Sequence, residues 1–386
     1  MNVIVNTLSV TPGRGGVKTY LLNLLDGLSK VASDDSITLL CSEQNQSLFD
    51  RHVRGQSNVE RIVFPLRRDV PPLRIFFDQV LVPLHCRQYE DAVLLSQASA
   101  SSLLAPLREV VIMQTPLSVR SIREEVPAEA DTTSWPQRMY YDAILPCTLR
   151  RADQVVAVSG HLREKILELY PWSAPKVRTV HEGVDLDRFK ADTRSDSAVG
   201  DESYLLFVST LFPYKRADQT IRAFARVMEQ DDWNDLRLKL AGKDPGEESQ
   251  RLRRIAHEHG VHDRVDVLGA VPHAEMPELY RGAEALLFPS TVETFGLPVL
   301  EAMACGTPVI ASDRMSVPEI VGEAGLVVDP DDTVAFTDAI CRLLEDESLR
   351  DNLRAAGKER VQEFTWDRTA QGVWNALEDA KQSAET

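Results

Sequence analysis

Short apolar runs alternate with helical patterns along the whole chain, and this alternation limits the folds that the chain can adopt. In the first half the runs are Val3–Val5, Ile37–Cys41, Ala92–Leu95, Val110–Met113 and Gln154–Val158. In the second half they are Tyr204–Val208, Leu236–Ala241, Val265–Leu268, Ala285–Phe288, Val309–Ala311 and Leu326–Val328. Continuous apolar runs are typical of strands that are buried on both faces of a parallel sheet, under two layers of helices. The sequence therefore predicts an α/β fold.

A polar stretch separates the two series of strands. Residues 190–203 read KADTRSDSAVGDES and are poor in large apolar side chains, which is typical of an interdomain linker. We therefore predict one Rossmann-like domain over residues 1–189 and a second one that begins at residue 204. Two such domains facing across a cleft would present the carboxyl ends of two parallel sheets, where ligands bind in folds of this kind.

The net charge of the chain is −16, and it is unevenly distributed. Residues 1–190 carry 22 basic and 22 acidic side chains, whereas the remaining residues carry 21 basic and 37 acidic ones. Because nucleic-acid binding depends on a basic surface, we expect no nucleic-acid partner. The difference between the halves predicts two domains with different surfaces.

The sequence also predicts a cellular compartment. Its apolar runs fall short of the roughly 18 residues that a membrane-spanning helix needs. The first residues, MNVIVNTLSV, lack the basic segment and long apolar run of a secretory signal. The five cysteines form no CxxC pair, which predicts neither a disulfide framework nor a structural zinc site. We therefore expect a cytoplasmic protein.

The most informative stretch is PSTVETFGLPVLEAMACGTP, residues 289–308. Pro298 suits the first turn of a helix and Gly306 suits its end. The backbone amides at residues 295–297 would then lie at a helix N-terminus, which favours an anion without any charged side chain. Glu293 precedes that terminus and Glu301 lies about one turn inside it. Two carboxylates beside an anion site suit a ligand rich in hydroxyl groups, because each carboxylate accepts several O–H bonds.

This stretch resembles the EX7E motif of the retaining GT-B glycosyltransferases known as glycosyltransferase family 4 or group 1. Similar stretches of that family occur in order along nearly the whole chain, at 15–17, 151–159, 180–189, 208–216 and 364–366. The resemblance implies the GT-B architecture, with an N-terminal acceptor domain and a nucleotide-sugar donor domain over residues 204–365. It also implies a final helix, residues 366–386, that crosses back to the N-terminal domain.

The resemblance further implies roles for individual residues. Glu293 would be the catalytic residue that lies against the transferred sugar, and Glu301 would hold the ribose hydroxyls of the donor. Lys215 would neutralise the donor diphosphate. The other donor-binding residues would be Gly15, Gly16, Arg216, Thr294, Phe295, Gly296 and Leu297. At Gly15 and Gly16 the lack of a Cβ would let the backbone approach a phosphate.

The implied reaction moves a hexose, with retention at the anomeric carbon, from a nucleotide-diphosphate sugar to a hydroxyl acceptor. The acceptor would be a glycan, a lipid-linked sugar or a small molecule, and the sequence names neither the donor base nor the sugar. Front-face transfer and a covalent intermediate both stay open. So do two other functions: a GT-B sugar-nucleotide epimerase and a non-catalytic nucleotide-sugar-binding protein.

Two positions depart from the family pattern. Many members carry an arginine five residues before the lysine, where this chain has Thr210. Many also carry a histidine after the strand that ends here at Met113, and this chain has Gln114. A glutamine can hydrogen-bond a sugar hydroxyl or an acceptor, but it cannot titrate. We therefore predict a sugar or acceptor contact for Gln114 without acid–base chemistry.

Three other patterns point to cofactors or metals and are weighed against simpler interpretations. A dinucleotide-binding GxGxxG read from Gly13 requires glycine at 18, where Lys18 stands, which argues against a nicotinamide dehydrogenase. The histidines at 257, 259, 262 and 273 lack HExxH spacing and are predicted to be solvated, and Asp185-Leu186-Asp187 follows a glycine as a turn does. We predict no metal site and no cofactor.

The stretch Arg61–Tyr89 mixes basic and large apolar side chains. Its basic residues include Arg67, Arg68, Arg74 and Arg87. Such a composition fits peripheral contact with an anionic membrane or a lipid-linked acceptor at the inner face of the membrane. An ordinary amphipathic surface helix with snorkelling arginines explains the same pattern.

Overall fold

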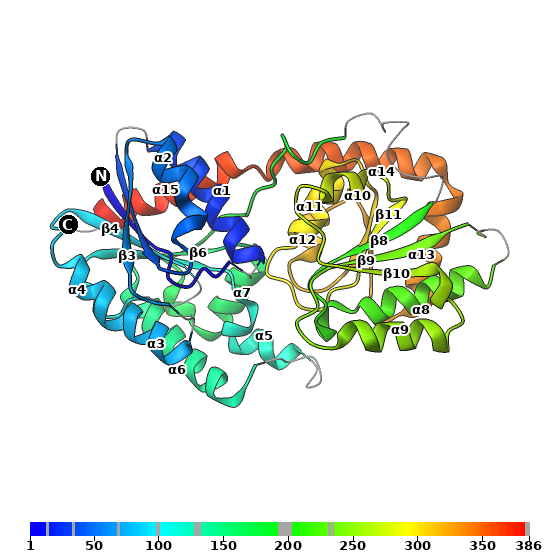
Figure 1. The fold of residues 1–386 in the computed structure, drawn as a ribbon, viewed down its shortest axis with the longest axis horizontal. Coiled ribbons are helices and arrows are strands. Elements are labelled where there is room, and N and C mark those ends of the chain that lie inside the picture. The colour runs from blue at the N-terminus through cyan, green and yellow to red at the C-terminus, as the bar shows by residue number, and fades with distance from the viewer. Residues whose placement is uncertain are drawn as a thin grey trace. The chain divides into compact units, whose positions relative to one another are not determined.

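The computed structural model describes residues 1–12, 15–32, 35–67, 70–97, 101–126, 133–191, 203–230, 233 and 235–382. The chain divides into two compact units (Figure 1). Unit 1 comprises Met1–Glu125, Thr133–Gly183 and the segment that begins at Trp366, and unit 2 comprises, among the described residues, Val126 and Val184–Thr365. Residues 192–202, most of the predicted linker, lie outside the described residues.

Unit 1 is built on a parallel sheet of seven strands in the order β3-β2-β1-β4-β5-β6-β7. The strands are β1 (Asn2–Asn6), β2 (Ser36–Ser42), β3 (Val59–Phe64), β4 (Ala92–Ser96), β5 (Arg108–Met113), β6 (Gln154–Ala157) and β7 (Val177–Thr179). Strand β1 pairs with β2 on one side and with β4 on the other. The strand order therefore reverses between β1 and β4, and ligands of such sheets bind at the carboxyl ends beside that reversal.

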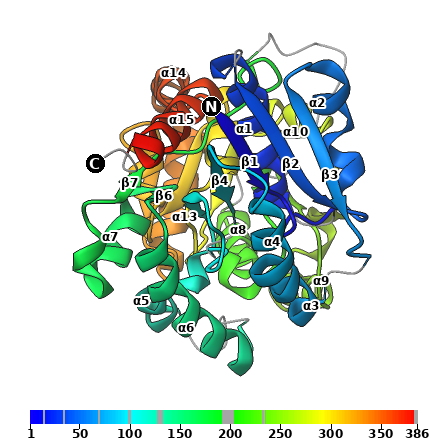
Figure 2. The ribbon, with the colours of Figure 1, turned by 90° about the vertical axis from the view of Figure 1, so that its left-hand side faces the viewer.

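Helices cover both faces of this sheet. They are α1 (Gly15–Val31), α2 (Asp50–Gly55), α3 (Pro71–Phe76), α4 (Val82–Cys86), α5 (Arg120–Glu125), α6 (Trp135–Arg151), α7 (Gly160–Leu169) and α15 (Trp366–Gln382). The C-terminal helix α15 packs beside α1 at the start of the chain (Figure 2). Gly27 of α1 permits this close approach, because a Cβ there would lie 2.6 Å from the Cβ of Ala370 in α15.

Unit 2 repeats the same strand order with a different sequence. Its six parallel strands run β10-β9-β8-β11-β12-β13. They are β8 (Tyr204–Val208), β9 (Arg237–Ala241), β10 (Val265–Gly269), β11 (Ala285–Phe288), β12 (Val309–Ser312) and β13 (Leu326–Val328). The helices are α8 (Ala217–Met228), α9 (Glu248–Glu258), α10 (Met276–Arg281), α11 (Leu297–Ala304), α12 (Val317–Val321), α13 (Thr333–Glu345) and α14 (Glu347–Arg360). The order is that of a Rossmann fold, with its reversal between β8 and β11.

The predicted fold class is confirmed: the chain forms two Rossmann-like α/β domains with parallel sheets. Each of the eleven predicted runs is a strand. Two strands were not predicted. Strand β3 reads VERIVF, so charged residues interrupt its apolar pattern at the edge of the sheet, and β7 has only three residues.

The stretch Arg61–Tyr89 is not a single amphipathic helix. It begins inside β3, and its helical part runs without a break over Pro71–Cys86, through α3, a π-helical turn over Phe77–Leu81 and α4. Phe76 of α3 and Leu84 of α4 have about half of their surface exposed. Arg67 pairs with Glu43 at 2.8 Å, while Arg68 lies outside the described residues. Among the helices of the described ranges, none has the length and apolarity needed to span a membrane.

Candidate active site

The strand reversal of unit 2 brings together two residues that lie far apart in the sequence. Lys215 follows β8 and Glu293 follows β11, and these strands are neighbours in the sheet. The Lys215 ammonium lies 2.5 Å from Glu293 Oε1 and 3.2 Å from the carbonyl oxygen of Val292. The two side chains are 12% and 14% exposed, so the ion pair is largely shielded from water. The predicted phosphate-binding cation and the predicted catalytic carboxylate are thus direct partners.

The loops that carry this pair are tied to each other through their backbones. The amide and the hydroxyl of Thr291 both donate to the carbonyl oxygen of Tyr214, at 2.9 and 3.0 Å. Ser316, beyond β12, donates its hydroxyl to the carbonyl oxygens of Glu293 and Phe295, at 3.1 and 3.2 Å. The Glu293 backbone is therefore held in place by groups from other loops, and this fixes the position from which its side chain extends.

Helix α11 begins at the predicted position. Gly296 is its N-cap residue with a φ of +113°, Leu297 opens the helix and Pro298 lies in its first turn. A φ of this sign is readily adopted only by glycine, which explains the residue at 296. Gly306, with a φ of +76°, follows the C-cap residue Cys305. The N-terminus of α11 thus lies directly after Glu293, where its dipole favours an anion.

Glu301 lies one turn inside α11 and is held by two side chains that the sequence analysis did not select. The Tyr280 hydroxyl donates to Glu301 Oε2 at 2.9 Å, and His273 Nε2 lies 3.4 Å from Oε1. Burial, and then the charge of Glu301, raise the pKa of Tyr280, so the phenol stays a hydrogen-bond donor. The expectation that His273 is only a solvated surface residue is therefore incomplete. Its position shortly after the carboxyl end of β10 was the available signal.

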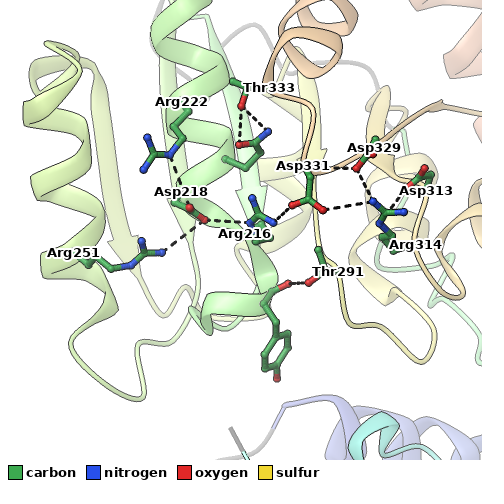
Figure 3. Close-up of polar contacts among 12 residues, drawn as sticks. Arg216, Asp218, Arg222, Arg251, Thr291, Asp313, Arg314, Asp329, Asp331 and Thr333 are labelled. Carbon is green, nitrogen blue, oxygen red and sulfur yellow. Dashed lines mark hydrogen bonds and ion pairs between the residues drawn. The ribbon is translucent and has the colours of Figure 1, made fainter. Parts of the chain in front are cut away.

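Arg216 does not share the environment of Lys215. Its guanidinium forms an ion pair with Asp331 and lies 3.7 Å from Asp218 (Figure 3). This contact lowers the pKa of Asp331. Arg314 extends the network, at 3.5 Å from Asp331 and 2.8 Å from Asp329. Arg216 also has a φ of +56°, so its backbone is in the left-handed region. Its side chain therefore leaves the chain in a different direction from that of the preceding residue, Lys215. Its predicted diphosphate contact stays a prediction.

Unit 1 presents a different set of groups at the carboxyl edge of its sheet. Gln114, after β5, donates from Nε2 to Glu182 Oε1 at 3.1 Å, and both side chains are buried. Glu182 lies in the stretch 180–189 that resembles the family, and no role was predicted for it. Its carboxylate also contributes, after burial, to a raised pKa of Tyr20 on α1. A buried carboxylate and amide in contact can bind a hydroxyl group of a ligand.

Gly15 and Gly16 open α1 at the same edge of unit 1. A Cβ built on either residue would meet no atom within 4 Å, so packing within the chain does not require glycine there. The neighbouring residues Gly13 and Arg14 lie outside the described residues. The predicted approach of a phosphate to these glycines stays a prediction.

The predicted turn at residues 185–187 is present. Asp185 Oδ1 accepts from the backbone amides of Asp187 and Arg188, at 3.2 and 3.1 Å. The rings of His257 and His262 stack on each other with centroids 4.7 Å apart. Across the part of the chain that the structure describes, His, Cys, Asp and Glu side chains form no group of three or more suited to a metal ion.

Comparison with known proteins assigns the two units. Residues 14–188 match the family described as Glycosyltransferase Family 4, and residues 189–360 match the one described as Glycosyl transferases group 1. The chain belongs to these family 4, group 1 glycosyltransferases. Its α/β fold is that of GT-B glycosyltransferases.

Several curated proteins and solved structures are similar to this glycosyltransferase-family chain. The O-antigen chain mannosyltransferase B of Escherichia coli is 30% identical over 61% of this chain and 63% of its own length. The D-inositol 3-phosphate glycosyltransferase of Nocardia farcinica is 31% identical over 68% of this chain and 60% of its own. This chain therefore spans less than two thirds of either relative.

Two solved structures cover nearly the whole chain at low identity. Sucrose-phosphate synthase from Thermosynechococcus elongatus has a TM-score of 0.77 and 22% identity over 100% of both chains. The Anabaena protein HepE, solved in complex with UDP and glucose, has a TM-score of 0.74 and 18% identity over 98% of this chain and 99% of its own. At these identities the likeness establishes the fold.

Proposed function

We infer that this protein transfers a hexose, with retention, from a nucleotide-diphosphate sugar to a hydroxyl group of a glycan, a lipid-linked sugar or a small molecule. The observation that carries this function is the arrangement around the start of α11. Glu293 and Glu301 flank that helix N-terminus, and Lys215 contacts Glu293 at 2.5 Å. Mannosyl and inositol-phosphate glycosyltransferases among the relatives support the same function.

Each group at this site has a task in the proposed reaction. The donor diphosphate attracts the Lys215 ammonium and the α11 amides, because a charge-assisted hydrogen bond to phosphate is about twice as strong as a neutral one. Lys215 then exchanges a carboxylate partner for a phosphate partner, and Glu293 is released towards the transferred sugar. Glu301 accepts the ribose hydroxyls. The HepE complexes with UDP and with UDP-glucose support a donor of this class.

The leaving nucleoside diphosphate develops negative charge, and we assign its stabilisation to Lys215 and to the N-terminus of α11. Fixed positive groups of this kind act without reorganising during the reaction. We therefore expect turnover to continue in excess EDTA, with at most a modest effect of added magnesium. Loss of activity with EDTA and full recovery with manganese would contradict this assignment.

The acceptor is assigned to unit 1, where Gln114 and Glu182 form a buried hydrogen-bonded pair. We further assign the protein to the cytoplasm, with peripheral contact to the inner face of the membrane through α3 and α4. Exposed Phe76 and Leu84 support that contact. Wild-type protein that fails to sediment with anionic liposomes at low salt would overturn it.

The test of the proposed function is a donor screen followed by product analysis. UDP, GDP and ADP and their sugars are compared by thermal unfolding, since a ligand at 100 times its Kd stabilises by about 2.7 kcal/mol. The selected sugar nucleotide is then incubated with glycan and lipid-linked acceptors. We expect acceptor-dependent release of the nucleoside diphosphate and, by NMR, the same anomeric configuration in product and donor.

Other results would identify a different function. Conversion of the donor sugar without release of nucleotide indicates an epimerase. Tight binding without turnover across the acceptor panel indicates a nucleotide-sugar-binding protein, and an inverted product contradicts retention.

A further inference from the structure

We propose that Arg188 and His273 position the Glu301 carboxylate for the two hydroxyl groups of a ribose, and thereby set how strongly the site prefers ribonucleotides to deoxyribonucleotides. The inference rests on the proposed function, in which Glu301 accepts the ribose hydroxyls. It assigns a new positioning role to a histidine and an arginine of unit 2. Both residues lie outside the EX7E segment.

The hydrogen-bond partners of His273 determine which ring nitrogen carries the proton. Arg188 Nη1 lies 2.6 Å from His273 Nδ1. A guanidinium has donors only, so the nitrogen that faces it must accept. In the neutral imidazole the proton is then on Nε2, which faces Glu301 Oε1 at 3.4 Å. Arg188 thus makes His273 a donor toward the carboxylate.

Glu301 is consequently held by a different donor at each oxygen. Tyr280 donates to Oε2 at 2.9 Å and His273 faces Oε1. A carboxylate offers about four lone-pair positions, so each oxygen keeps one for a ligand hydroxyl. Two oxygens fixed in one plane match a pair of neighbouring hydroxyl groups, as a ribose carries at its 2′ and 3′ positions.

The ring of His273 is itself supported by packing. Phe189, which is fully buried, contacts the His273 ring edge-on at 5.4 Å and the Tyr280 ring at 6.1 Å between centroids. Asp185 lies 3.7 Å from Arg188 Nε, so the guanidinium also has an anchor. One aromatic side chain therefore sets the distance between the two donors of Glu301. The 3.4 Å contact is long, and such contacts often shorten when a ligand binds.

The test compares a ribonucleoside diphosphate with its 2′-deoxy counterpart. Calorimetry uses UDP, GDP or ADP, whichever the thermal screen selects, against dUDP, dGDP or dADP. His273→Ala should weaken binding of the ribonucleotide about five- to tenfold and leave the deoxynucleotide within about twofold, because only the ribonucleotide uses both oxygens. His273→Gln, which keeps an N–H donor of similar reach, should restore most of the difference. His262→Ala is the matched control, since that histidine is also half-exposed and has no contact with Glu301 among the described interactions.

Two outcomes separate this inference from the proposed function. If Glu301→Ala weakens binding of the ribonucleotide more than that of the deoxynucleotide, but His273→Ala weakens both equally, the positioning role is wrong and the donor site stands. If Glu301→Ala also weakens both equally, or if wild-type protein binds no nucleoside diphosphate, the ribose assignment itself fails. Thermal midpoints of each variant, measured without ligand, show that the protein is folded.

Discussion

The carboxyl edges of the two sheets share one topology and differ in chemistry. Both sheets reverse strand order beside a central strand, β1 in unit 1 and β8 in unit 2. In unit 2 the residues beyond that reversal are ionic, with Lys215 paired to Glu293. In unit 1 they are two glycines and a buried amide–carboxylate pair, Gln114 and Glu182. A charged, rigid edge suits a diphosphate, and an edge with few charges suits hydroxyl groups.

This difference shows that topology determines where a site lies, whereas side chains determine which ligand it binds. The acidic excess of the C-terminal half supports this conclusion. That half carries 21 basic and 37 acidic residues, so its general field repels a diphosphate. In the proposed function, Lys215 and the N-terminus of α11 therefore attract the diphosphate locally. Substitutions at each edge test whether the two edges act as separately as their chemistry implies.

The largest effect is expected from Glu293→Gln, which removes the charge that we propose lies beside the transferred sugar. Turnover should fall roughly 100- to 1,000-fold, as when other electrostatic contacts to a transition state are removed. Binding of the nucleoside diphosphate should survive or tighten, because Lys215 loses its competing carboxylate partner. Initial rates and calorimetry measure the two quantities. Glu258→Gln, an exposed residue at the end of α9, is the control, and near-normal turnover in Glu293→Gln would refute the catalytic role.

Lys215→Ala should raise the Kd of the nucleoside diphosphate roughly 10- to 100-fold, because a hydrogen bond to a charged group contributes about 1.5–3 kcal/mol. The salt dependence of binding should also decrease. Part of the loss comes from Glu293, whose charge is left without its lysine and repels phosphate. The double variant Lys215→Ala with Glu293→Gln should therefore bind more tightly than Lys215→Ala alone. Equal affinity in wild type and Lys215→Ala would break the assignment of the diphosphate to unit 2.

Much of this edge of unit 2 could be predicted from sequence because its parts are local. Glu293, Gly296, Pro298 and Glu301 lie within one short segment, and helix and turn rules apply to such a segment directly. The contact between Lys215 and Glu293 joins residues that are 78 positions apart. The resemblance to the family predicted a common site for these two residues. Their ion pair could be predicted only with knowledge of the strand order.

Other parts could not be predicted because their pairing depends on packing. Gln114 and Glu182 are 68 positions apart, and the sequence around either residue does not indicate that the two side chains pair. The sequence indicated only that His273 was one of four surface histidines. Its contacts with Arg188 and Glu301 are evident only from the structure. Strand β3 was missed because two adjacent charged residues, Glu60 and Arg61, interrupt it, so this edge strand lacks the continuous apolar pattern of a central one.

Gln114→Ala tests the edge of unit 1. We expect the acceptor KM to rise about two- to tenfold, since one neutral hydrogen bond contributes about 0.5–1.5 kcal/mol, while the Kd of the nucleotide stays unchanged. Unfolding by urea should show a loss of stability, because the variant leaves the buried Glu182 without this donor. Gln97→Ala is a matched variant: that amide is also buried after a strand, but within the described residues its side chain has no hydrogen-bond partner. A changed nucleotide Kd in Gln114→Ala would show that the edges share a ligand.

The smallest effect is expected from Arg216→Gly. This variant tests whether the adjacent cations Lys215 and Arg216 have different roles. The ion pair with Asp331 is partly exposed, at 24% and 57%, and such pairs contribute about 0–1 kcal/mol. Glycine also removes the strain of a side chain at a φ of +56°, although it adds freedom to the unfolded chain. These terms nearly cancel, so we expect the free energy of unfolding to change by less than about 1 kcal/mol.

Arg216→Ala provides the matched comparison, because it loses the same ion pair and keeps a Cβ in the left-handed region. It should be less stable than Arg216→Gly, and the difference measures the backbone term alone. The Kd of the nucleoside diphosphate should rise less than twofold in either variant, as expected if Asp331 holds the guanidinium. A rise as large as that of Lys215→Ala would mean that Arg216 leaves Asp331 when the diphosphate arrives. The ion-pair network of Figure 3 would then be a resting state of the donor site.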